Sequence, residues 1–565
     1  MVDVKAWLRS NIPVLEWLPR YQRKDLRTDL IAGLTVGAVV IPSAMGWASL
    51  AGLPTQYGLY AALASLIAYF IFGSSKHLVV VPSSGPAALV GAGLMGLVFA
   101  DQNEYIAAVA MLAFITGVML IMARMVRLGF IVNFISQTVL IGFQIGLAFY
   151  VINLQLGRIL GISGASGNFF EVAIYYVKNI GEASLTTISI ALMAFALIYI
   201  GKRFYRKIPW NLVLIIVATA FATLLPVEDW GIDVVGTIPE GLPDFVVPST
   251  GGQSLTALIT IAVGLFLITY IEGVSVSKTF ARKGKYEVDS NQEFVGYGAA
   301  NLAASFFQGM PLNGSASNTA INYESNAKSQ LSGAVAAVVL ILVLLFLTSF
   351  FSNLPRVVIG VIIIAAMLTL IDVRSMRSIY SFDKKEFAFA VAAILGVLLF
   401  GLLEGIFIGV ALTMLDLLYR ISQPGIRLLG RVPGTDEFTD LDRNPENETM
   451  ANVAIFRVDG PLMFPNVARV RQEVLRHVRE GNNVKLVVVS LRSSPYLDLS
   501  ATEMIADLFT ELRDLGANLR LAEANGSCRD SIRQAGLEAK IGEMNPGMSV
   551  QKVVEGWTEG TLNPQ

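Results

Sequence analysis

Apolar runs long enough to cross a lipid bilayer recur along the first 420 residues of this chain. A helix needs about 20 consecutive apolar residues to span the roughly 30 Å of hydrocarbon in a membrane. Only 15% of the 565 residues are charged and 54% are hydrophobic, whereas soluble domains average about 25% charged residues. The sequence therefore predicts an α-helical membrane protein.

About fourteen spans are predicted from these runs. They lie near 30–50, 57–72, 85–100, 105–123, 130–156, 183–201, 209–225, 254–280, 289–308, 315–327, 329–350, 355–371, 385–401 and 403–420. Lys and Arg gather in alternate loops, such as 202–207, whereas 226–253 holds five carboxylates and neither Lys nor Arg. Because cytoplasmic loops are enriched in Lys and Arg, we expect a multi-pass protein of the cell (inner or plasma) membrane with an even span count and both termini cytosolic. The amphipathic stretch FFEVAIYYVKNI is expected to lie in the interface.

Composition divides the chain into four parts. We predict a cytosolic lead-in at 1–28, a transmembrane domain at 29–422, a polar linker at 423–450 and a small α/β domain at 451–565. The last part carries three short apolar strand candidates, VAIFRV, VKLVVVSL and LRLAEA, and two helices with apolar residues at helical spacing. It contains no Walker-type phosphate loop and no His/Cys cluster, which argues against a nucleotide-driven motor and against an enzyme.

Charge and cysteine content exclude further classes. The net charge of −1 predicts no affinity for nucleic acid. The single cysteine, Cys528, has no partner within the chain for a disulfide. Lipid is therefore the partner that composition indicates.

A break in the helical pattern occurs twice inside the membrane part. HLVVVPSSGPAALVGAG and QGMPLNGSASNTAIN each pass from an extended apolar stretch through the pattern Pro-x-x-Gly-x-Ala into a short helix. Irregular backbone is tolerated at membrane depth only where protein or a cavity surrounds it. The equivalent prolines, Pro82 and Pro311, are separated by about half of the membrane part, as expected for two inverted repeats of seven spans each.

Each break starts a half-helix near the middle of the bilayer. Unpaired N–H groups and the positive dipole end at such a start favour an anion. Gly85 and Gly314 would let the anion approach the backbone. The side chains able to donate hydrogen bonds to it are Ser83, Ser84, Ser315, Ser317 and Asn318. Tight helix packing at the glycines is the alternative explanation, although it does not account for the shared pattern.

Glu272 lies within the otherwise apolar span 254–280. An isolated charge there is costly, so Glu272 needs a partner or a proton. An ionised carboxylate would repel a bound anion, so either Glu272 is protonated during binding or a cation such as Na⁺ is bound near it. Both options predict cotransport of H⁺ or Na⁺ with the anion. The alternative is a permanently neutral Glu272 that hydrogen-bonds a neighbouring helix.

The sequence also resembles a known family over nearly its whole length. GLTVGAVVIPSAMGWASLAGLPTQYGLYAA at 33–62, the segment 271–309 and the second break with NAKSQLSG at 326–333 are similar to the sulfate permease (SulP) family, and the C-terminal domain resembles a STAS domain. The resemblance implies about fourteen spans in a 7+7 inverted repeat of the uracil-permease type. It also implies a core and a gate domain and an elevator-like motion in a homodimer.

The resemblance implies an anion site between the two half-helices. The positions that carry over are Ser43, Ser84, Gly85, Pro86, Ala87, Ser315, Ala316, Ser317 and Asn318, with Glu272 nearby. Two positions depart from the family pattern: many members have Ser-Phe-Ser-Arg where this chain has Ser-Ala-Ser-Asn at 315–318, and many have Gln in place of Ser43. Without the arginine the pull on a divalent anion is weaker, so bicarbonate is an alternative to sulfate.

In the STAS-like domain, SSPYLDLSATEMI at 493–505 resembles the loop in which an Asp precedes a Ser or Thr that can be phosphorylated. These positions correspond to Asp498 and Ser500. A phosphate on Ser500 at a helix start would be favourable. The alternative, compatible with the first, is that Ser500 is the N-cap and Glu503 completes a capping box.

Three functions follow. The leading hypothesis is a secondary active transporter of inorganic anions, with sulfate and H⁺ symport first and Na⁺-coupled bicarbonate transport as the alternative. A different class is an anion-responsive membrane scaffold or sensor whose cytosolic domain recruits a partner. The intramembrane Glu272 favours transport over sensing. A nucleobase permease is disfavoured, because the breaks lack paired carboxylates to bind a base edge.

Overall fold

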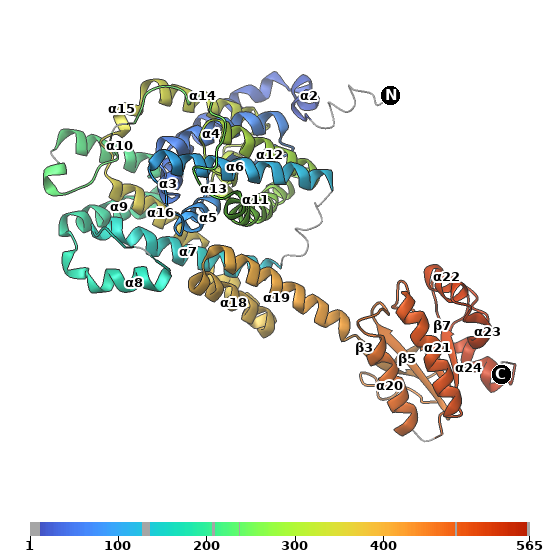
Figure 1. The fold of residues 1–565 in the computed structure, drawn as a ribbon. Coiled ribbons are helices and arrows are strands. Elements are labelled where there is room, and N and C mark those ends of the chain that lie inside the picture. Colours follow the sequence, from blue (N-terminus) through green and yellow to red (C-terminus); the bar gives the residue numbers. More distant parts are fainter. Residues whose placement is uncertain are drawn as a thin grey trace. The chain divides into compact units, whose positions relative to one another are not determined.

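The computed structural model describes residues 12–126, 136–165, 167–205, 210–225, 227–236, 238–480 and 483–561. The chain divides into two compact units, Met1–Thr413 and Met414–Gln565. The first is built of helices packed on helices, and the second contains a sheet with helices beside it (Figure 1).

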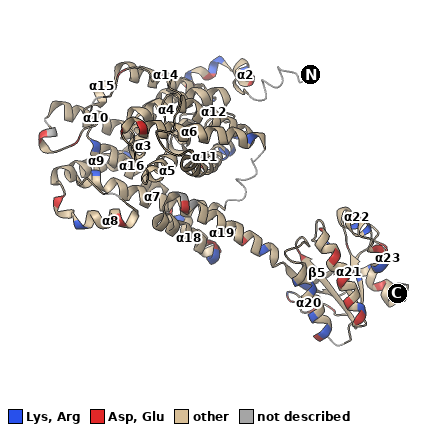
Figure 2. Ribbon diagram, in the orientation of Figure 1, with Lys and Arg blue, Asp and Glu red and all other residues tan. Residues whose placement is uncertain are grey.

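A helix lies over each predicted span, and the first residues of the span predicted at 130–156 lie outside the described residues. The helices are α2 (Val14–Trp17), α3 (Leu26–Leu50), α4 (Gln56–Phe72), α5 (Ser84–Leu94), α6 (Gln102–Met125), α7 (Gln137–Leu160), α8 (Phe169–Lys178), α9 (Leu185–Phe204), α10 (Trp210–Leu224), α11 (Leu255–Gly284), α12 (Ser290–Phe306), α13 (Ala316–Glu324), α14 (Leu331–Phe346), α15 (Thr348–Phe351), α16 (Arg356–Met367), α17 (Val373–Phe382), α18 (Lys384–Phe400) and α19 (Leu402–Ser422). Among the described residues, 6 helical stretches are long and apolar enough to cross a membrane. Charged residues are sparse along the packed helices (Figure 2). The count of fourteen spans stays a prediction.

The helices of the first unit associate in two groups. Helices α3, α4, α5 and α6 pack with α11, α12, α13 and α14, whereas α7 and α9 pack with α16, and α7 also with α18. Small residues allow close approach at these contacts. A Cβ added at Gly117 of α6 would lie 2.9 Å from the carbonyl oxygen of Gly298 on α12. Such contacts replace the hydrophobic drive that is absent between helices in lipid.

The two predicted breaks lie side by side. The strand β1 (Val80–Val81) pairs antiparallel with β2 (Asn313–Gly314), with Val80 opposite Gly314 and Val81 opposite Asn313. The N–H of Ser315 extends the pairing to the carbonyl of Val79 at 2.9 Å. All of these residues are buried, so the backbone polar groups of the breaks bond one another rather than lipid. The prediction of two extended breaks followed by short helices is confirmed.

The amphipathic stretch forms α8, which begins with a capping box between Asn168 and Glu171. Val172 and Tyr176 are buried, whereas Ile174 and Val177 are exposed. An apolar outer face on a short helix is typical of a helix that lies in the membrane interface. That location stays a prediction.

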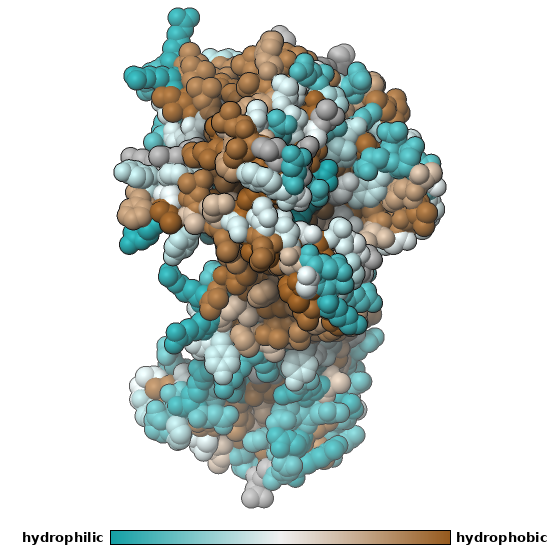
Figure 3. Space-filling view, turned by 90° about the vertical axis from the view of Figure 1, so that its left-hand side faces the viewer, coloured by the Kyte–Doolittle hydropathy of each residue, from teal (hydrophilic) through white to brown (hydrophobic). Residues whose placement is uncertain are grey.

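The C-terminal unit contains a five-stranded sheet with the order β4-β3-β5-β6-β7. Its elements are β3 (Gly425–Arg431), β4 (Phe438–Asp440), β5 (Val453–Asp459), α20 (Val467–Glu480), β6 (Leu486–Ser490), α21 (Leu499–Asp514), β7 (Asn518–Ala522), α22 (Gly526–Gln534), α23 (Glu538–Ile541) and α24 (Val550–Thr558). The three predicted strands β5, β6 and β7 are parallel neighbours, and the predicted helices α20 and α21 are present. The surface of this unit is largely hydrophilic, while apolar side chains cover much of the helical unit (Figure 3).

The prediction of a linker over 423–450 is corrected by β3 and β4. Strand β3 pairs antiparallel with both β4 and β5, so this segment belongs to the sheet. Leu428 packs against the core on one face, and Leu429 is buried on the other. The polar residues hold the hairpin: the Asn447 amide donates to Thr439 Oγ1 at 2.6 Å. Composition alone could not separate such a hairpin from a linker.

Candidate functional site

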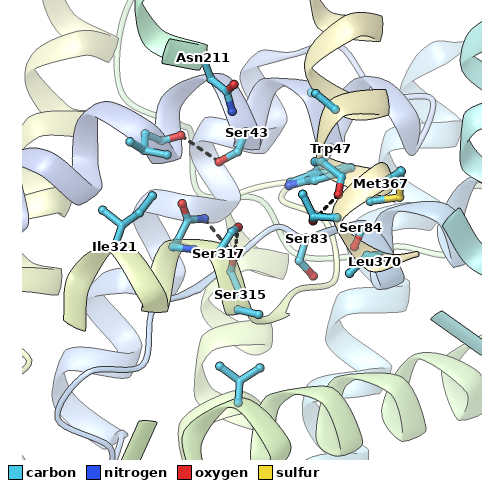
Figure 4. Close-up of a pocket in the computed structure, with 18 of the residues that line it drawn as sticks. Ser43, Trp47, Ser83, Ser84, Asn211, Ser315, Ser317, Ile321, Met367 and Leu370 are labelled. Carbon is cyan, nitrogen blue, oxygen red and sulfur yellow. Dashed lines mark hydrogen bonds between the residues drawn. The ribbon is translucent and has the colours of Figure 1, made fainter. Parts of the chain in front are cut away.

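A cavity of about 1210 Å³ lies in the helical unit where the two breaks meet. Its polar lining comes from both breaks, from α3, α7, α9, α10, α11 and α13, and from the turn after α16. These side chains are Thr35, Ser43, Trp47, Ser83, Ser84, Gln144, Lys202, Asn211, Glu272, Ser275, Asn313, Ser315, Ser317, Asn318, Glu324, Ser325 and Thr369. In Figure 4, Ser83 and Ser84 from one break and Ser315 and Ser317 from the other gather around the same space. The cavity therefore joins the two half-helix starts, as the sequence predicts.

The start of α5 is left uncapped by its own N-cap residue. Ser83 has the extended backbone of an N-cap, yet its side chain does not accept from the helix. Its hydroxyl donates to Oδ1 of Asn313 on β2 instead. The first amide bonded back along the helix is that of Ala87, which donates to the Ser83 carbonyl at 3.1 Å. The amides of Ser84 and Gly85 precede it and lie at the positive end of the helix dipole.

The start of α13 is capped. Ser315 Oγ accepts from the backbone N–H of Asn318 at 3.4 Å and from the Asn318 side-chain amide at 3.0 Å. Its hydroxyl also lies 3.4 Å from the hydroxyl of Ser317. Two backbone N–H groups precede the first bonded amide at each start: those of Ser84 and Gly85 on α5, where Pro86 carries no N–H, and those of Ala316 and Ser317 on α13. The two starts therefore differ in their side chains, because the Ser315 hydroxyl caps α13 whereas that of Ser83 bonds Asn313.

Glu272 faces the breaks from the middle of α11. The Asn313 side-chain amide donates to its Oε2 at 2.7 Å, which provides the polar partner that a carboxyl in an apolar span requires. A Cβ added at Gly85 would lie 3.0 Å from the same oxygen, so the carboxyl sits directly behind the α5 start. Asn313 is neutral, so the charge of an ionised Glu272 still needs a proton or a cation to balance it.

The strand β2 is held in place by a second buried asparagine. The Asn301 side chain on α12 accepts from the N–H of Leu312 at 3.1 Å and donates to its carbonyl at 3.1 Å. On the other break, the N–H of Val79 donates to Thr319 Oγ1 on α13 at 3.0 Å. These bonds satisfy backbone groups that no helix can satisfy, and they fix Asn313 between Ser83 and Glu272.

Most predicted binding residues line the cavity: Ser43, Ser84, Ser315, Ala316, Ser317, Asn318 and Glu272. Gly85, Pro86 and Ala87 are not among the described residues that line it, so their part in binding stays a prediction. A Cβ at Gly85 would lie 2.6 Å from Ile268 Cδ1, so this face of α5 packs on α11. The Ser43 hydroxyl donates within its own helix, with the carbonyls of Val39 and Val40 at 3.1 and 3.0 Å.

Sequence reasoning missed several lining residues. Asn313 lies inside the second break, at the position that corresponds to Ser84 in the shared pattern, and that correspondence is the signal that could have singled it out. Lys202 is the one Lys or Arg among the described lining residues, although its cluster at 202–207 suggested only a cytosolic loop. Trp47, Gln144 and Asn211 lie in ordinary apolar runs, where nothing in the pattern distinguishes them.

In the C-terminal unit, Asp498 is the N-cap of α21. Its carboxylate accepts from the N–H of Ala501 at 2.8 Å and from the N–H of Phe464 at 2.8 Å. The expectation that Ser500 caps this helix, with Glu503 in a capping box, is therefore wrong. Ser500 is the second residue of the helix because the turn ends two residues earlier than the capping pattern suggests. It remains at a helix start, where a phosphate would be favourable.

Comparisons with known proteins agree with this architecture. Residues 26–393 match the sulfate permease family, and residues 444–553 match the STAS domain. A probable sulfate transporter of Mycobacterium tuberculosis (strain ATCC 25618 / H37Rv) is 33% identical over 536 residues, covering 95% of this chain and 96% of that protein. Probable sulfate transporter 4.2 of Arabidopsis thaliana is 31% identical over 558 residues, covering 95% and 82%.

Two solved structures share the fold. The murine Slc26a9 anion transporter in its inward-facing state has a TM-score of 0.91 at 22% identity, covering 99% of this chain and 96% of that one. The transmembrane domain of the cyanobacterium bicarbonate transporter BicA has a TM-score of 0.61 at 21% identity, covering 70% and 98%. From these matches and the two breaks that enclose one cavity, the chain belongs to the sulfate permease family of membrane transporters and carries a C-terminal STAS domain.

Proposed function

We propose that this protein is a secondary active transporter of inorganic anions, with sulfate as substrate and H⁺ as the symported ion. One observation supports the proposal above the others: the uncapped start of α5, the hydroxyls of α13 and the carboxyl of Glu272 share one cavity. The helix starts favour an anion, and Glu272 supplies a group that binds a proton.

The coupling follows from electrostatics. An ionised Glu272 behind the α5 start repels an anion placed at that start, and the repulsion is strong where little water screens it. A proton on Glu272 removes the repulsion. Anion and proton therefore bind best together, and a proton gradient drives the anion uphill.

Sulfate is favoured because relatives that match 95% of this chain carry the name of probable sulfate transporters. Lys202 adds a positive charge to the lining, which favours anions over neutral solutes. Backbone amides and hydroxyls replace part of the hydration shell of the anion.

A second candidate is Na⁺-coupled transport of bicarbonate. It is favoured by the neutral Asn318 at the start of α13, where a fixed positive charge would favour a divalent anion, and by the fold shared with a bicarbonate transporter. Na⁺ bound near Glu272 would then offset the carboxylate as the proton does in the first proposal. The oxygen atoms of Glu272 and Asn313 are suitable Na⁺ ligands.

We infer an elevator-type mechanism. Both breaks and Glu272 belong to the group formed by α3–α6 and α11–α14, which would move as the core. The group of α7, α9, α10, α16, α18 and α19 would form the gate, and two copies would join as a homodimer.

Both termini are proposed to be cytosolic, with the transport domain at 29–422.

We also propose that the STAS domain regulates transport through the loop that starts α21. Asp498 fixes the loop, and Ser500 presents its hydroxyl in the first turn, where phosphorylation would add charge at a favourable helix end. A cytosolic partner that binds this loop would distinguish the two states of Ser500.

Uptake of labelled sulfate and of labelled bicarbonate into proteoliposomes tests the proposal. Each anion is supplied with an inward H⁺ gradient, an inward Na⁺ gradient, or neither. Sulfate accumulation driven by H⁺ supports the first candidate, and bicarbonate accumulation driven by Na⁺ supports the second. Absence of uptake for both anions in all conditions contradicts transport and favours a scaffold or sensor.

A further inference from the structure

A single buried amide connects the α5 start with Glu272. Asn313 is fully buried, its Oδ1 accepts from the Ser83 hydroxyl, and its Nδ2 donates to Glu272 Oε2 at 2.7 Å. Ser83 and Glu272 both line the cavity. Each end of one rigid amide therefore contacts a group that matters for the proposed H⁺-coupled transport, on which this inference rests.

We propose that Asn313 is a positioning residue that couples the protonation of Glu272 to the hydrogen-bonding direction of Ser83. An ionised carboxylate only accepts hydrogen bonds, so it must face the NH₂ group of Asn313. The amide oxygen then faces Ser83 and accepts a hydrogen bond from its hydroxyl. In this state Ser83 has no proton left to donate and turns lone pairs toward the cavity, which disfavours an anion.

Protonation of Glu272 reverses the direction of the hydrogen bonds from Ser83 through Asn313 to Glu272. The carboxylic acid now donates its O–H, and the acceptor available is the Asn313 amide oxygen once the amide has turned over. The NH₂ group then faces Ser83 Oγ and donates to it. The Ser83 hydroxyl then no longer donates to Asn313 and can donate a hydrogen bond to the anion. The proton taken up stays on Glu272, and the other groups change only the direction of their hydrogen bonds.

The arrangement of the two breaks supports this role. Ser83 occupies the N-cap position of α5 but bonds Asn313 rather than the helix, whereas Ser315 at the equivalent position caps α13. A serine that does not cap its helix can turn its hydroxyl to another partner, which here is Asn313. Ser83 would therefore add a switched donor to the fixed amides of Ser84 and Gly85.

The surroundings of Glu272 leave Asn313 as its specific partner. Helix α5 and the strands β1 and β2 carry no titratable side chain. On α12, Tyr297 packs at Gly273, and Glu293 bonds Tyr69 and Ser74. The other charged groups that line the cavity among the described residues are Lys202 and Glu324. Tyr270 lies near the middle of α11, and its hydroxyl donates to the Ser290 carbonyl at 3.5 Å. The remaining ionisable residues of α6, α11 and α13 lie toward the helix ends: Glu104, Tyr105, Arg124, Lys278, Arg282, Lys283 and Tyr323.

The test measures sulfate affinity on the acidic and alkaline sides of the pH transition, by half-saturation of sulfate exchange in proteoliposomes. In the unmodified protein we expect tighter binding in acid. In Ser83→Ala the acid affinity falls about tenfold, the value of one hydrogen bond to an anion, while the alkaline affinity changes little. In Asn313→Ala the hydroxyl of Ser83 is free at both pH values, so the alkaline affinity rises toward the acid one.

Matched variants separate this effect from loss of structure. Ser84→Ala removes a neighbouring hydroxyl of the same cavity, and we expect it to weaken sulfate by the same factor at both pH values. Ser83→Thr keeps the hydroxyl and is expected to keep the pH dependence. Sulfate titrations of the purified protein, followed by tryptophan fluorescence with Trp47→Phe as control, measure binding without transport, because Trp47 lines the cavity.

The outcomes distinguish the two proposals. If the unmodified protein binds sulfate equally at both pH values, the H⁺-coupled function fails and this inference with it. If the unmodified protein is pH-dependent but Ser83→Ala and Asn313→Ala retain its full acid-to-alkaline ratio, simple repulsion by Glu272 explains coupling and the amide switch is wrong. The switch is supported if the ratio of acid to alkaline sulfate affinity falls in both Ser83→Ala and Asn313→Ala but stays unchanged in Ser84→Ala.

Discussion

At the scale of single residues, the anion chemistry depends on neutral side chains where a cation would be expected. Asn318 is buried at the start of α13, and its amide donates to Ser315. Many members of the family have arginine at this position. Lys202 is the one Lys or Arg among the described lining residues, and we therefore propose that hydrogen bonds provide most of the selectivity.

Restoring the arginine tests that view. Asn318→Arg is expected to lower the half-saturating concentration of sulfate about tenfold relative to a monovalent anion, because a fixed charge favours the divalent ion and charge-assisted hydrogen bonds are the stronger ones. Competition of sulfate and chloride in exchange assays measures the ratio. Asn318→Gln is the neutral control, and an equal gain in both variants would mean that size rather than charge decides.

Another buried carboxylate has a structural role. Glu293 on α12 accepts from the Tyr69 hydroxyl at 2.9 Å, from the Ser74 hydroxyl at 2.7 Å and from the Ser74 N–H at 3.2 Å. These bonds fix the turn between α4 and β1, and so the first break. A fully hydrogen-bonded carboxylate of this kind needs no proton from the transport cycle.

Glu293→Gln is expected to lower the free energy of unfolding by about 2 kcal/mol, since it replaces charge-assisted hydrogen bonds with neutral ones. Thermal unfolding in detergent measures the loss. A double-mutant cycle with Ser74→Ala isolates the shared bond. If Glu293→Gln abolished pH-dependent transport without loss of stability, Glu293 would belong to the coupling mechanism instead.

At the scale of elements, glycine contacts set how closely the core helices approach. A Cβ at Gly117 of α6 would meet Leu302 Cγ at 2.8 Å and the Gly298 carbonyl oxygen at 2.9 Å, so backbone would have to shift. Gly181, between α8 and α9, has open space around the same position. The two glycines therefore form a matched pair for substitution.

Gly117→Ala is expected to lower the melting temperature by several degrees and to reduce transport, because α6 and α12 must separate. Gly181→Ala should leave both quantities unchanged. The comparison is made by thermal unfolding and by exchange activity in the same preparation. A neutral Gly117→Ala would show that this contact does not limit helix packing.

The cap of α21 gives a second prediction about an element. Asp498→Ala removes the acceptor for two backbone N–H groups and is expected to destabilise the C-terminal unit by about 1–2 kcal/mol. Ser500→Ala is expected to have little effect, since the hydroxyl of Ser500 is not the cap. Limited proteolysis of the C-terminal unit in the full chain measures both. The reverse order of stabilities would restore Ser500 as the cap.

At the scale of the whole molecule, the sequence predicts the elements better than their contacts. The apolar runs predict the helices because length and hydropathy are local properties, and the repeated Pro-x-x-Gly-x-Ala predicts the breaks because proline and glycine restrict the backbone locally. The pairing of Ser83 with Asn313 joins residues 230 positions apart, and no local pattern specifies it. The hairpin β3–β4 was missed because its polar turn residues resemble a linker.

The site was predicted in part for the same reason. Ser84, Ser315, Ser317 and Asn318 follow directly from the breaks, whereas Lys202 lines the cavity on α9, which packs against α7, α10 and α16. Glu272 could be singled out by its unusual charge in an apolar span. Its partner could not, because that depends on the antiparallel register of β1 and β2.

The most direct test of proton-coupled anion transport is sulfate uptake by proteoliposomes that contain either the unmodified protein or Glu272→Gln, under an inward H⁺ gradient and in exchange against internal sulfate. The account predicts that Glu272→Gln abolishes uphill accumulation while exchange remains measurable, because the glutamine cannot gain or lose the coupling proton. Uphill accumulation that persists in Glu272→Gln would contradict the account and remove Glu272 from the coupling mechanism.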